Sequence, residues 1–394
     1  MRFEQCVLQV IPALNEGGAE RTTLEIARAI VEAGGKALIA TSGGRLAAEA
    51  EKAGARIFAV PVHSKNPLTI LANRGRLIRI IKDEAVDLVH VRSRAPAWSA
   101  LLAARATSAP LAATWHGIYS ENGALKRFYN SGLARADLVI ANSAYTADQI
   151  RRTREIGDRL TIIHRGADLS AFDLASVGAA RIERLRAAWG LSAGVALTLL
   201  LPARFSDWKG HEVAIAAAKR LKDEPRYGLG EDFRLIFAGD SEGKGGFAAS
   251  LRRAIGEAGL ERVIRLVGHC EDMPAAYALA DIVLSPSTRP EAFGRVAAEA
   301  GAMGRVAVGA DHGGARETII DGETGFLTPP GSAAALADAI FKAVEMGAAG
   351  RADMGKKARA RISEEFSTKA MTDRTIAAYE KLLLRTKEGA AGLV

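Results

Sequence analysis

Residues 290–299 read Pro-Glu-Ala-Phe-Gly-Arg-Val-Ala-Ala-Glu and place two glutamates, Glu291 and Glu299, eight positions apart. An apolar run typical of a buried strand, Ile282–Leu284, precedes the stretch, and a helical pattern, Arg295–Met303, overlaps its end. A strand, a loop and a helix N-terminus in this order bring backbone N–H groups and the positive end of a helix dipole to one point, which suits an anion such as a phosphate. A carboxylate on that helix can hold a pair of ribose hydroxyls, as in dinucleotide-binding folds. Two glutamates at this spacing also occur as unrelated surface residues, so the rest of the chain has to decide.

The bulk properties describe a two-domain globular protein. The chain has 394 residues, of which 48% are hydrophobic and 25% charged, and a single core stops growing below this length. No apolar run approaches the roughly 20 residues that cross a bilayer, and the first residues lack the apolar segment of a signal peptide. Cys6 and Cys270 are the only cysteines, too few for a disulfide framework or a zinc site. We therefore expect a cytoplasmic protein that does not cross a membrane.

Short apolar runs with strand character alternate with helical stretches along the whole chain. Near-continuous apolar strands separated by helices indicate parallel sheets covered by helices on both faces. The alternation pauses at Leu174–Gly190, which is charged and rich in alanine, so two doubly wound α/β halves joined near residue 180 are the simplest interpretation. The predicted strands are Val7–Ile11, Lys36–Thr41, Arg56–Val62, Leu88–Val91, Leu111–Thr114, Leu138–Ala141 and Leu160–Ile163 in the first half, and Val195–Leu201, Leu235–Ala238, Val263–Val267, Ile282–Leu284 and Val306–Val308 in the second.

Two cations follow the first strand of the second half. Arg204 and Lys209 stand five positions apart in the loop before Gly210, and open parallel sheets bind ligands at the carboxyl ends of their strands. A guanidinium fork and an ammonium group together can neutralise a diphosphate leaving group. Two exposed loop cations without a function are the alternative.

Glycines and a histidine follow strands of the first half. Gly17 and Gly18 form a turn between the first strand and a helix, where a substrate can approach the backbone closely. His116 ends another strand beside Gly117, so it is a candidate for ligand contact, although a lone histidine is more often structural. Arg92 and Arg94 follow a third strand and can contact an acidic acceptor or serve only as surface charge.

The two glutamates with Phe-Gly after the first resemble the motif of retaining GT-B glycosyltransferases that use nucleotide sugars, glycosyltransferase family four. Other stretches match this family in the expected order along nearly the whole chain. They are Gly17-Gly18-Ala-Glu-Arg, His116-Gly117, Asn142-Ser143, Gly166-Ala-Asp168, Lys209-Gly210 and Gly239-Asp240. The family more often has Val at position 167 and Gly at 241, where this chain has Ser241.

The resemblance implies two Rossmann-like domains with a cleft between them. Residues 1–178 would form the acceptor-side domain, 190–366 the nucleotide-sugar domain, and 367–394 a helix that crosses back to the first domain. The helix pattern itself runs from Thr368 to about Arg385.

The resemblance also implies the residue roles. The expected catalytic residues are Glu291, His116, Arg204 and Lys209. Arg204 and Lys209 would hold the donor diphosphate, Glu299 the ribose hydroxyls, and Glu291 the sugar, together with the N–H groups of Phe293, Gly294 and Arg295. His116 would reach the donor sugar. The remaining expected donor contacts are Gly17, Gly18, Gly239 and His269.

Several motifs are missing from the sequence. No two aspartates stand two positions apart, so the metal site of the other main glycosyltransferase fold is lacking. The chain also has no P-loop, no G-x-G-x-x-G fingerprint and no G-x-S-x-G nucleophile elbow. We expect no cofactor and no metal ion, with the nucleotide sugar as a substrate.

Positive charge is concentrated in the first half. Residues 1–175 hold 23 basic and 17 acidic side chains, a net charge of +6, and the remainder has a net charge of +2. The basic residues of the helical stretch Asn73–Asp83 lie among Leu77, Ile78 and Ile81, and Lys126-Arg127 lie beside Phe128-Tyr129. Such segments can rest on an anionic bilayer, which would make the protein peripheral on the inner face of the membrane. Alternatively, the apolar residues face the sheet and the arginines only solvate the helix.

The resemblance implies a retaining hexosyltransferase. We expect a GDP-mannose or UDP-hexose donor and a glycan or lipid-linked acceptor of lipopolysaccharide or exopolysaccharide synthesis, with no nucleic-acid partner. A nucleotide-sugar 2-epimerase of the same fold is the alternative enzyme. An anionic-surface binding protein is the alternative outside the enzymes, but it leaves the strand-end motifs unexplained.

Overall fold

The computed structural model describes residues 2–15, 17–119, 123–191, 196–240 and 246–391, without the side chains of 389–391. Ser241 and Val195 therefore lie outside the described residues. The chain forms two compact units, residues 1–166 with 368–394 and residues 167–367. No helix in the described part of the chain has both the length and the apolar composition needed to cross a bilayer.

The first unit is built on a seven-stranded parallel sheet in the order β3-β2-β1-β4-β5-β6-β7. Its strands are β1 (Cys6–Val10), β2 (Lys36–Thr41), β3 (Arg56–Ala59), β4 (Leu88–Val91), β5 (Leu111–Trp115), β6 (Leu138–Ala141) and β7 (Leu160–Ile162). Its helices are α1 (Gly18–Glu32), α2 (Ala47–Lys52), α3 (Pro67–Asp83), α4 (Arg94–Thr107), α5 (Ala124–Ala134), α6 (Ala144–Thr153) and α15 (Thr368–Ala391).

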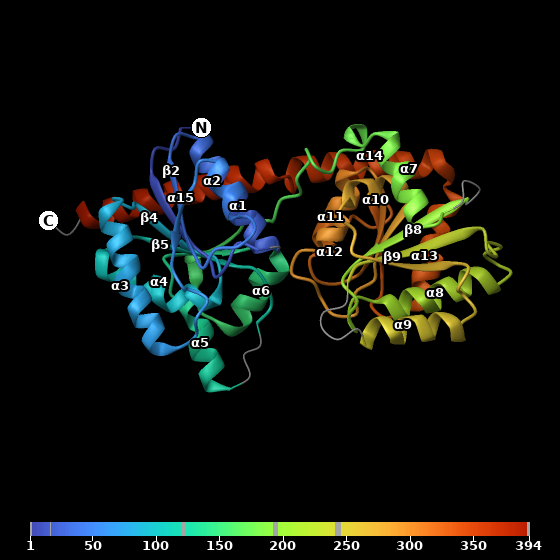
Figure 1. The fold of residues 1–394 in the computed structure, drawn as a ribbon, viewed down its shortest axis with the longest axis horizontal. Helices are drawn as coiled ribbons and strands as arrows, with labels where there is room; N and C mark the ends of the chain where they lie inside the picture. Colours follow the sequence, from blue (N-terminus) through green and yellow to red (C-terminus); the bar gives the residue numbers. More distant parts are fainter. Residues whose placement is uncertain (1, 16, 120–122, 192–195, 241–245, 392–394) are drawn as a thin grey trace. The chain divides into compact units, whose positions relative to one another are not determined.

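Helices cover both faces of this first sheet (Figure 1). One core joins the strands to α3, α4, α5 and α6, and the other joins them to α1, α2 and α15. Helix α15 enters the second of these cores through Met371, Ile376, Tyr379 and Leu382. The last helix of the chain therefore packs in the same unit as the first strand.

The second unit has a six-stranded parallel sheet in the order β10-β9-β8-β11-β12-β13. Its strands are β8 (Leu197–Pro202), β9 (Phe233–Ala238), β10 (Ile264–Gly268), β11 (Ile282–Ser285), β12 (Val306–Ala310) and β13 (Gly325–Thr328). Its helices are α7 (Ala179–Ala188), α8 (His211–Asp223), α9 (Gly246–Glu257), α10 (Met273–Leu279), α11 (Arg295–Ala302), α12 (Ala315–Thr318), α13 (Ala333–Glu345) and α14 (Gly347–Glu365). Helices α8, α9 and α13 share one core with the sheet, and α7, α10 and α11 share another.

Each predicted strand is present, and its ends differ from the predicted ends by at most three residues. The sequence analysis missed β13. The alternation does not pause at Leu174–Gly190, because this stretch contains a short 3-10 turn, Leu174–Ser176, followed by α7. Residues 167–178 lie in the second unit rather than at the end of the first. Ala167 pairs with Ser367, and Arg359 forms an ion pair with Asp173 at 2.8 Å. These tertiary contacts leave no signal in the local sequence pattern.

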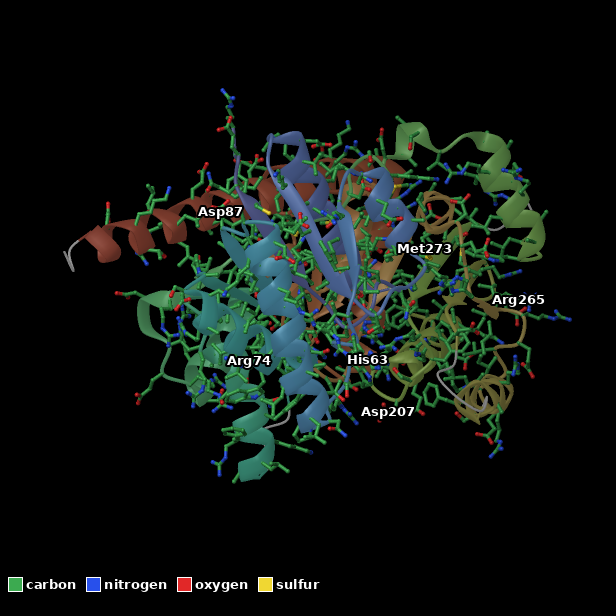
Figure 2. All side chains as sticks on the ribbon, turned by 60° about the vertical axis from the view of Figure 1, so that its left-hand side comes forward. His63, Arg74, Asp87, Asp207, Arg265 and Met273 are labelled. Atoms are coloured by element: carbon green, nitrogen blue, oxygen red, sulfur yellow. The ribbon has the colours of Figure 1, made fainter. Side chains whose placement is uncertain are left out.

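Two mid-helix glycines provide a matched test of packing in this fold. A Cβ atom at Gly355 of α14 would lie 2.0 Å from the carbonyl oxygen of Gly304, whereas a Cβ at Gly75 of α3, next to Arg74 (Figure 2), would meet nothing within 4 Å. Alanine favours a helix over glycine by up to about 1 kcal/mol, but overpacking costs about 1–3 kcal/mol. We expect Gly355→Ala to lower the midpoint of thermal unfolding and Gly75→Ala to raise it, as followed by circular dichroism. Equal stabilisation by both substitutions would contradict the close approach at Gly355.

Candidate functional site

The order of the strands determines where a ligand can bind in the second unit. The chain reverses its direction of growth between β8 and β11, which are neighbours in the sheet. At such a switch point the loops leave the carboxyl ends of the two strands in opposite directions and open a crevice between them. The loops that start there are residues 203–210 and 286–294, and they contain the cations and the glutamate singled out in the sequence.

Lys209 and Glu291 meet at this switch point. Their Nζ and Oε1 atoms are 2.9 Å apart, and the side chains are only 14% and 17% exposed. The hydroxyl of Ser287 donates to the same carboxylate oxygen at 2.5 Å. The ammonium group also lies 4.2 Å from the centre of the Trp208 ring. The structure therefore brings two of the predicted catalytic residues into one half-buried ion pair.

Backbone contacts hold these loops together. Gly210 has a positive φ of 80°, and a Cβ atom there would lie 2.0 Å from the carbonyl oxygen of Pro286. The amide of Thr288 donates to the carbonyl of Trp208 at 2.7 Å. These contacts require a glycine at position 210 and join the loop after β8 to the loop after β11, which keeps Lys209 next to Glu291.

A third loop, after β12, supports Glu291 from the other side. The amide of Gly314 donates to the carbonyl of Glu291 at 2.9 Å, and a Cβ at Gly314 would lie 2.3 Å from backbone atoms of Phe293. Nε2 of His312 donates to the carbonyl of Ser287 at 2.7 Å. The glutamate is thus positioned by loops from three neighbouring strands.

Glu299 lies one turn into α11 and is 12% exposed. Its Oε2 accepts a hydrogen bond from the hydroxyl of buried Tyr277 at 2.8 Å, and its Oε1 accepts two from the guanidinium of Arg295 at 2.7 and 3.1 Å. Burial and the nearby Glu299 carboxylate raise the pKa of Tyr277, so the phenol stays protonated and keeps donating. Glu299 is therefore held in one orientation, and its Oε2 has a second lone pair for a ligand hydroxyl.

Helix α11 begins without a side-chain cap. Its N-cap is Gly294, at a φ of 77°, which has no side chain to cap the helix. The first N–H groups of a helix point out of its end and are suited to an anion. The ring of Phe293 is buried and packs on Phe366. Phe293 and Gly294 therefore offer a ligand their backbone rather than side chains.

The other predicted donor contacts of the second unit lie at the same edge of the sheet. Arg204 is exposed in the loop after β8, in which Figure 2 labels Asp207, and His269 is exposed after β10. A Cβ atom at Gly239 would lie 2.0 Å from the carbonyl oxygen of Ala203. Gly239 is thus required for the backbone of the loop after β9 to pack against the loop after β8. Its contact with a nucleotide stays a prediction.

The first unit has its own switch point between β1 and β4. Gly17 is the N-cap of α1, again without a capping side chain. A Cβ at Gly18 would lie 2.1 Å from the guanidinium of Arg165, so the glycine makes room for this arginine. Nε of Arg165 donates to the Thr22 hydroxyl at 3.3 Å. An arginine and the positive end of a helix therefore lie together at this edge.

His116 follows β5 near the same switch point. Both of its ring nitrogens are buried and have no hydrogen-bond partner among the described residues. Burial, and then the charges of Arg92 and Arg165, lower the pKa of His116 well below its usual value. The ring is neutral near pH 7. It can donate or accept a hydrogen bond to a ligand, but it does not carry a charge.

The polar residues in and after β4 differ in burial and in their contacts. Arg92 is 1% exposed, so the interpretation of this residue as surface charge is wrong. Arg94 donates to Asn130 Oδ1 at 3.2 Å and stacks on the Tyr119 ring at 3.9 Å. His90, within β4, contacts the Tyr379 hydroxyl at 2.5 Å and the Thr114 hydroxyl at 2.8 Å, and it is a core residue.

Sequence reasoning missed four residues of these two edges. Ser287 and His312 follow strands β11 and β12, and the rule that ligand-binding residues follow parallel strands identifies both as candidates. Arg165 follows β7 by the same rule. Tyr277 lies within α10 and has no comparable signal, because only the packing of α10 next to α11 brings its hydroxyl to Glu299.

Two family models match the chain. The model described as Glycosyl transferases group 1 matches residues 190–361, and the model described as Glycosyltransferase Family 4 matches residues 16–171. Together they match most of both units, including β4 of the first unit and both strands of the second switch point, β8 and β11.

Individual relatives agree with the family models. A D-inositol 3-phosphate glycosyltransferase of Nocardia farcinica is 33% identical over 216 residues, which are 53% of this chain and 45% of that protein. The match thus spans about half the length of this curated relative. A glycosyltransferase structure from Rickettsia africae is 32% identical with a TM-score of 0.88, over 96% of this chain and 99% of that one. The structure of Anabaena HepE in complex with UDP is 24% identical with a TM-score of 0.82, over 96% and 100% of the two chains.

The chain has two doubly wound parallel sheets and matches both family models. It is also similar over nearly its full length to the Rickettsia glycosyltransferase. The chain is an enzyme with the GT-B fold and belongs to the group 1 glycosyltransferases.

Proposed function

We propose that the protein is a retaining hexosyltransferase that moves a hexose from a nucleoside diphosphate sugar to a glycan or lipid-linked acceptor. The Lys209–Glu291 pair carries this proposal, because a cation and a carboxylate lie together at the switch point of the second unit. The uncapped N-terminus of α11 begins three residues after Glu291. This edge offers positive charge and amides to a diphosphate, and carboxylates to sugar hydroxyls.

The proposed roles follow the chemistry of each group. Lys209 and Arg204 neutralise the diphosphate, and Glu299 accepts hydrogen bonds from the ribose hydroxyls. Glu291 and the amides of Phe293, Gly294 and Arg295 hold the sugar. His116 donates a hydrogen bond to the donor sugar, and Gly17, Gly18, Gly239 and His269 bring backbone or ring atoms next to the donor. The proposal requires no metal ion, since two side-chain cations and a helix dipole are available for the charge of the leaving group.

The transfer would proceed on one face of the sugar. The bond between the anomeric carbon and the diphosphate oxygen breaks, and the acceptor oxygen bonds to the same carbon from the same side. The proton of the acceptor hydroxyl passes to an oxygen of the departing diphosphate. Lys209 and Arg204 stabilise the charge that develops on this leaving group, which is where electrostatic catalysis has its largest effect.

Donor and acceptor are proposed by class. We propose a UDP-hexose or GDP-mannose donor and a lipopolysaccharide or exopolysaccharide acceptor. Support for a nucleotide donor comes from the HepE structure, which contains UDP. A thermal-shift panel of UDP, GDP, ADP and their hexoses tests the donor, since a ligand that binds only the folded state raises its stability. NMR of the product then reports the anomeric configuration, and inversion would contradict the proposed mechanism.

A nucleotide-sugar 2-epimerase remains the alternative, because it shares the fold and the donor chemistry. The two activities differ in their need for an acceptor. Incubation of the donor without acceptor, followed by NMR of the sugar at carbon 2, separates them. Epimerised donor in the absence of acceptor would favour the epimerase.

The loop cations can be tested individually. We expect Lys209→Ala and Arg204→Ala each to reduce turnover by about 10²–10³-fold, comparable to loss of one oxyanion-hole donor, or about 2–4 kcal/mol. Lys219→Ala serves as the control, because Lys219 lies exposed on α8 in a surface pair with Asp223. Circular dichroism checks that each variant is folded. Near-normal activity of the double alanine variant would contradict the assignment.

The two glutamates should separate binding from turnover. We expect Glu299→Ala to weaken the affinity for the bare nucleoside diphosphate, and Glu291→Ala mainly to lower turnover, because one contacts the unreacting ribose and the other the reacting sugar. Tyr277→Phe removes only the donor that orients Glu299, so its affinity loss should be the smaller. Calorimetric titration measures the affinity of all three variants for the bare nucleoside diphosphate. Equal affinity loss in the two glutamate variants would argue against this division of roles.

The first unit exposes apolar and basic side chains on two helices of one sheet face. In α3, Leu77 and Ile81 are buried, so within the stretch Asn73–Asp83 the alternative holds and the apolar residues face the core. Helix α3 instead exposes Leu68 and Leu71 in its first turns, and α5 exposes Leu125 and Phe128 beside Lys126 and Arg127. We propose that these helix ends rest on an anionic membrane surface, which would supply a lipid-linked acceptor.

Vesicle sedimentation tests the membrane proposal. Each basic residue near an anionic surface contributes about 1 kcal/mol, so the protein should sediment with anionic vesicles at low salt and be released as salt rises. Lys126→Glu with Arg127→Glu should reduce the bound fraction, whereas Arg252→Glu with Arg253→Glu on α9 should not. An absence of vesicle binding at low ionic strength would mean that the acceptor arrives without a membrane.

A further inference from the structure

A groove lies at the amino edge of the second sheet. Its volume is about 620 Å³, which is within the range of roughly 300–1,000 Å³ that small-molecule sites occupy. Two of its lining residues, Asp281 and Arg305, immediately precede β11 and β12. The other lining side chains come from residues 173–175, from 303–306 and from α14, so the whole groove belongs to the second unit.

This groove is separate from the candidate site described above. Lys209 and Glu291 lie in loops that leave the carboxyl ends of β8 and β11, whereas the groove lies at the opposite ends of the strands. Strand β11 has four residues, and a strand rises about 3.3 Å per residue, so the two edges of the sheet are about 13 Å apart. A small ligand in the groove therefore does not reach the Lys209–Glu291 pair.

Positive charge predominates in the lining of the groove. Four cations and two carboxylates line it, which gives a net charge of +2; they are Arg305, Arg351, Lys356 and Arg359 with Asp173 and Asp281. Nη2 of Arg359 pairs closely with Oδ1 of Asp173, at 2.8 Å. The other three cations have only the carboxylate of Asp281 among the lining residues.

Two guanidinium groups share this carboxylate. The side chain of Arg351 is only 15% exposed, yet its Nη2 lies 3.7 Å from Asp281 Oδ1, and its Nη1 donates to the Ala343 carbonyl at 3.3 Å. Nη2 of Arg305 donates to the Ala278 carbonyl, while its Nε is buried without a hydrogen-bond partner among the described residues. Burial lowers the pKa of Arg305, and the charges of Asp281 and Arg351 act on it in opposite directions. Both guanidinium groups thus have capacity for a further acceptor.

The mouth of the groove adds a free cation and an apolar contact surface. Lys356 is exposed on α14 and forms no hydrogen bond or ion pair with the described residues. Its neighbour Lys357 lies outside the lining and pairs with Asp353 at 3.8 Å. Leu174, which also lines the groove, is 39% exposed, and Met303 lies in the same lining. The groove therefore offers positive charge beside apolar side chains.

We propose that this groove binds an organic phosphate monoester, with Arg305, Arg351 and Lys356 around the phosphate. A phosphate monoester carries a charge of about −1.5 to −2 near pH 7, which matches the net charge of the lining. Guanidinium forks fit phosphate oxygens in geometry. The organic part of the ligand packs on Leu174 and excludes water from it. Water alone can hydrogen-bond the cations, but it supplies no negative charge and leaves the leucine exposed.

The site goes beyond the proposed hexosyl transfer, because none of its residues has a role in that reaction. The test uses the full chain and three probes. Phenyl phosphate has the charge and an apolar body, inorganic phosphate has the charge alone, and phenol has the body alone. Calorimetry at low ionic strength should show that phenyl phosphate binds more tightly than inorganic phosphate and that phenol does not bind.

Variants assign the binding to the groove. Lys356→Glu should weaken the affinity for phenyl phosphate about tenfold or more, because a repulsive charge replaces an attractive one. Lys357→Glu makes the same charge change at the next position of α14, outside the lining, and should change the affinity less than about twofold because water and salt screen it. Arg351→Met should also weaken binding. Leu174→Ala should weaken binding of phenyl phosphate but not of inorganic phosphate.

Arg204→Ala distinguishes the groove from the catalytic edge, since Arg204 lies in the loop after β8. Binding of phenyl phosphate should survive this substitution and be lost in Lys356→Glu. The opposite pattern would place the probe at the catalytic edge and overturn the groove as its site.

Three further results would contradict the proposal. They are no binding of phenyl phosphate to the wild type, equal effects of Lys356→Glu and Lys357→Glu, or equal affinity for inorganic and phenyl phosphate. Lys356 is exposed, so its variant is expected to fold and keeps the test valid if Arg351→Met does not. The proposed function fails differently, since nucleotides would then give no thermal shift while phenyl phosphate still bound the groove.

Discussion

The ion pair between Lys209 and Glu291 is the interaction on which the site of the second unit depends. Each charge lies in a loop that leaves a different strand, and each is mostly shielded from water. Removal of one partner of such a pair would leave the other without compensation, at a cost of several kcal/mol. The pair therefore helps to hold the loops after β8 and β11 together. The contacts through Gly210 and Gly314 make this arrangement rigid.

The two units share the same topology at their switch points but have different residues there. Both are doubly wound parallel sheets in which the strand order reverses next to the first strand of the unit, and both have an uncapped helix N-terminus at that point. In the second unit the cation is paired with a carboxylate in the same crevice. In the first unit Arg92 is buried near a second arginine, Arg165, and its Nε and Nη2 have no hydrogen-bond partner among the described residues.

At two loop positions, Gly239 and Gly314, the close approach of another backbone segment requires a glycine. Gly239 and Gly314 each lie so near another backbone segment that a Cβ atom would overlap with it. A glycine required for such packing can be mistaken for a ligand-binding glycine, since both occur in loops after strands. Gly18 differs, because the space that it leaves is filled by the Arg165 guanidinium. There the glycine places a charge at the start of α1.

The sequence alone determined the class of the fold, the positions of nearly all strands and the stretches that carry the site. Period and composition are local properties, and apolar runs such as Leu88–Val91 and Leu138–Ala141 coincide with the observed strands to the residue. The tertiary structure alone decided which of the residues that follow strands meet. Sequence spacing does not reveal that Glu291 contacts Lys209, or that Tyr277 orients Glu299, because these contacts depend on the order of strands and helices in the sheet. The sequence also did not predict which arginine is buried, because Arg92 and Arg94 are two positions apart and have the same side chain. Only the packing around the end of β4 makes the first a buried, incompletely partnered charge and leaves the second stacked on Tyr119.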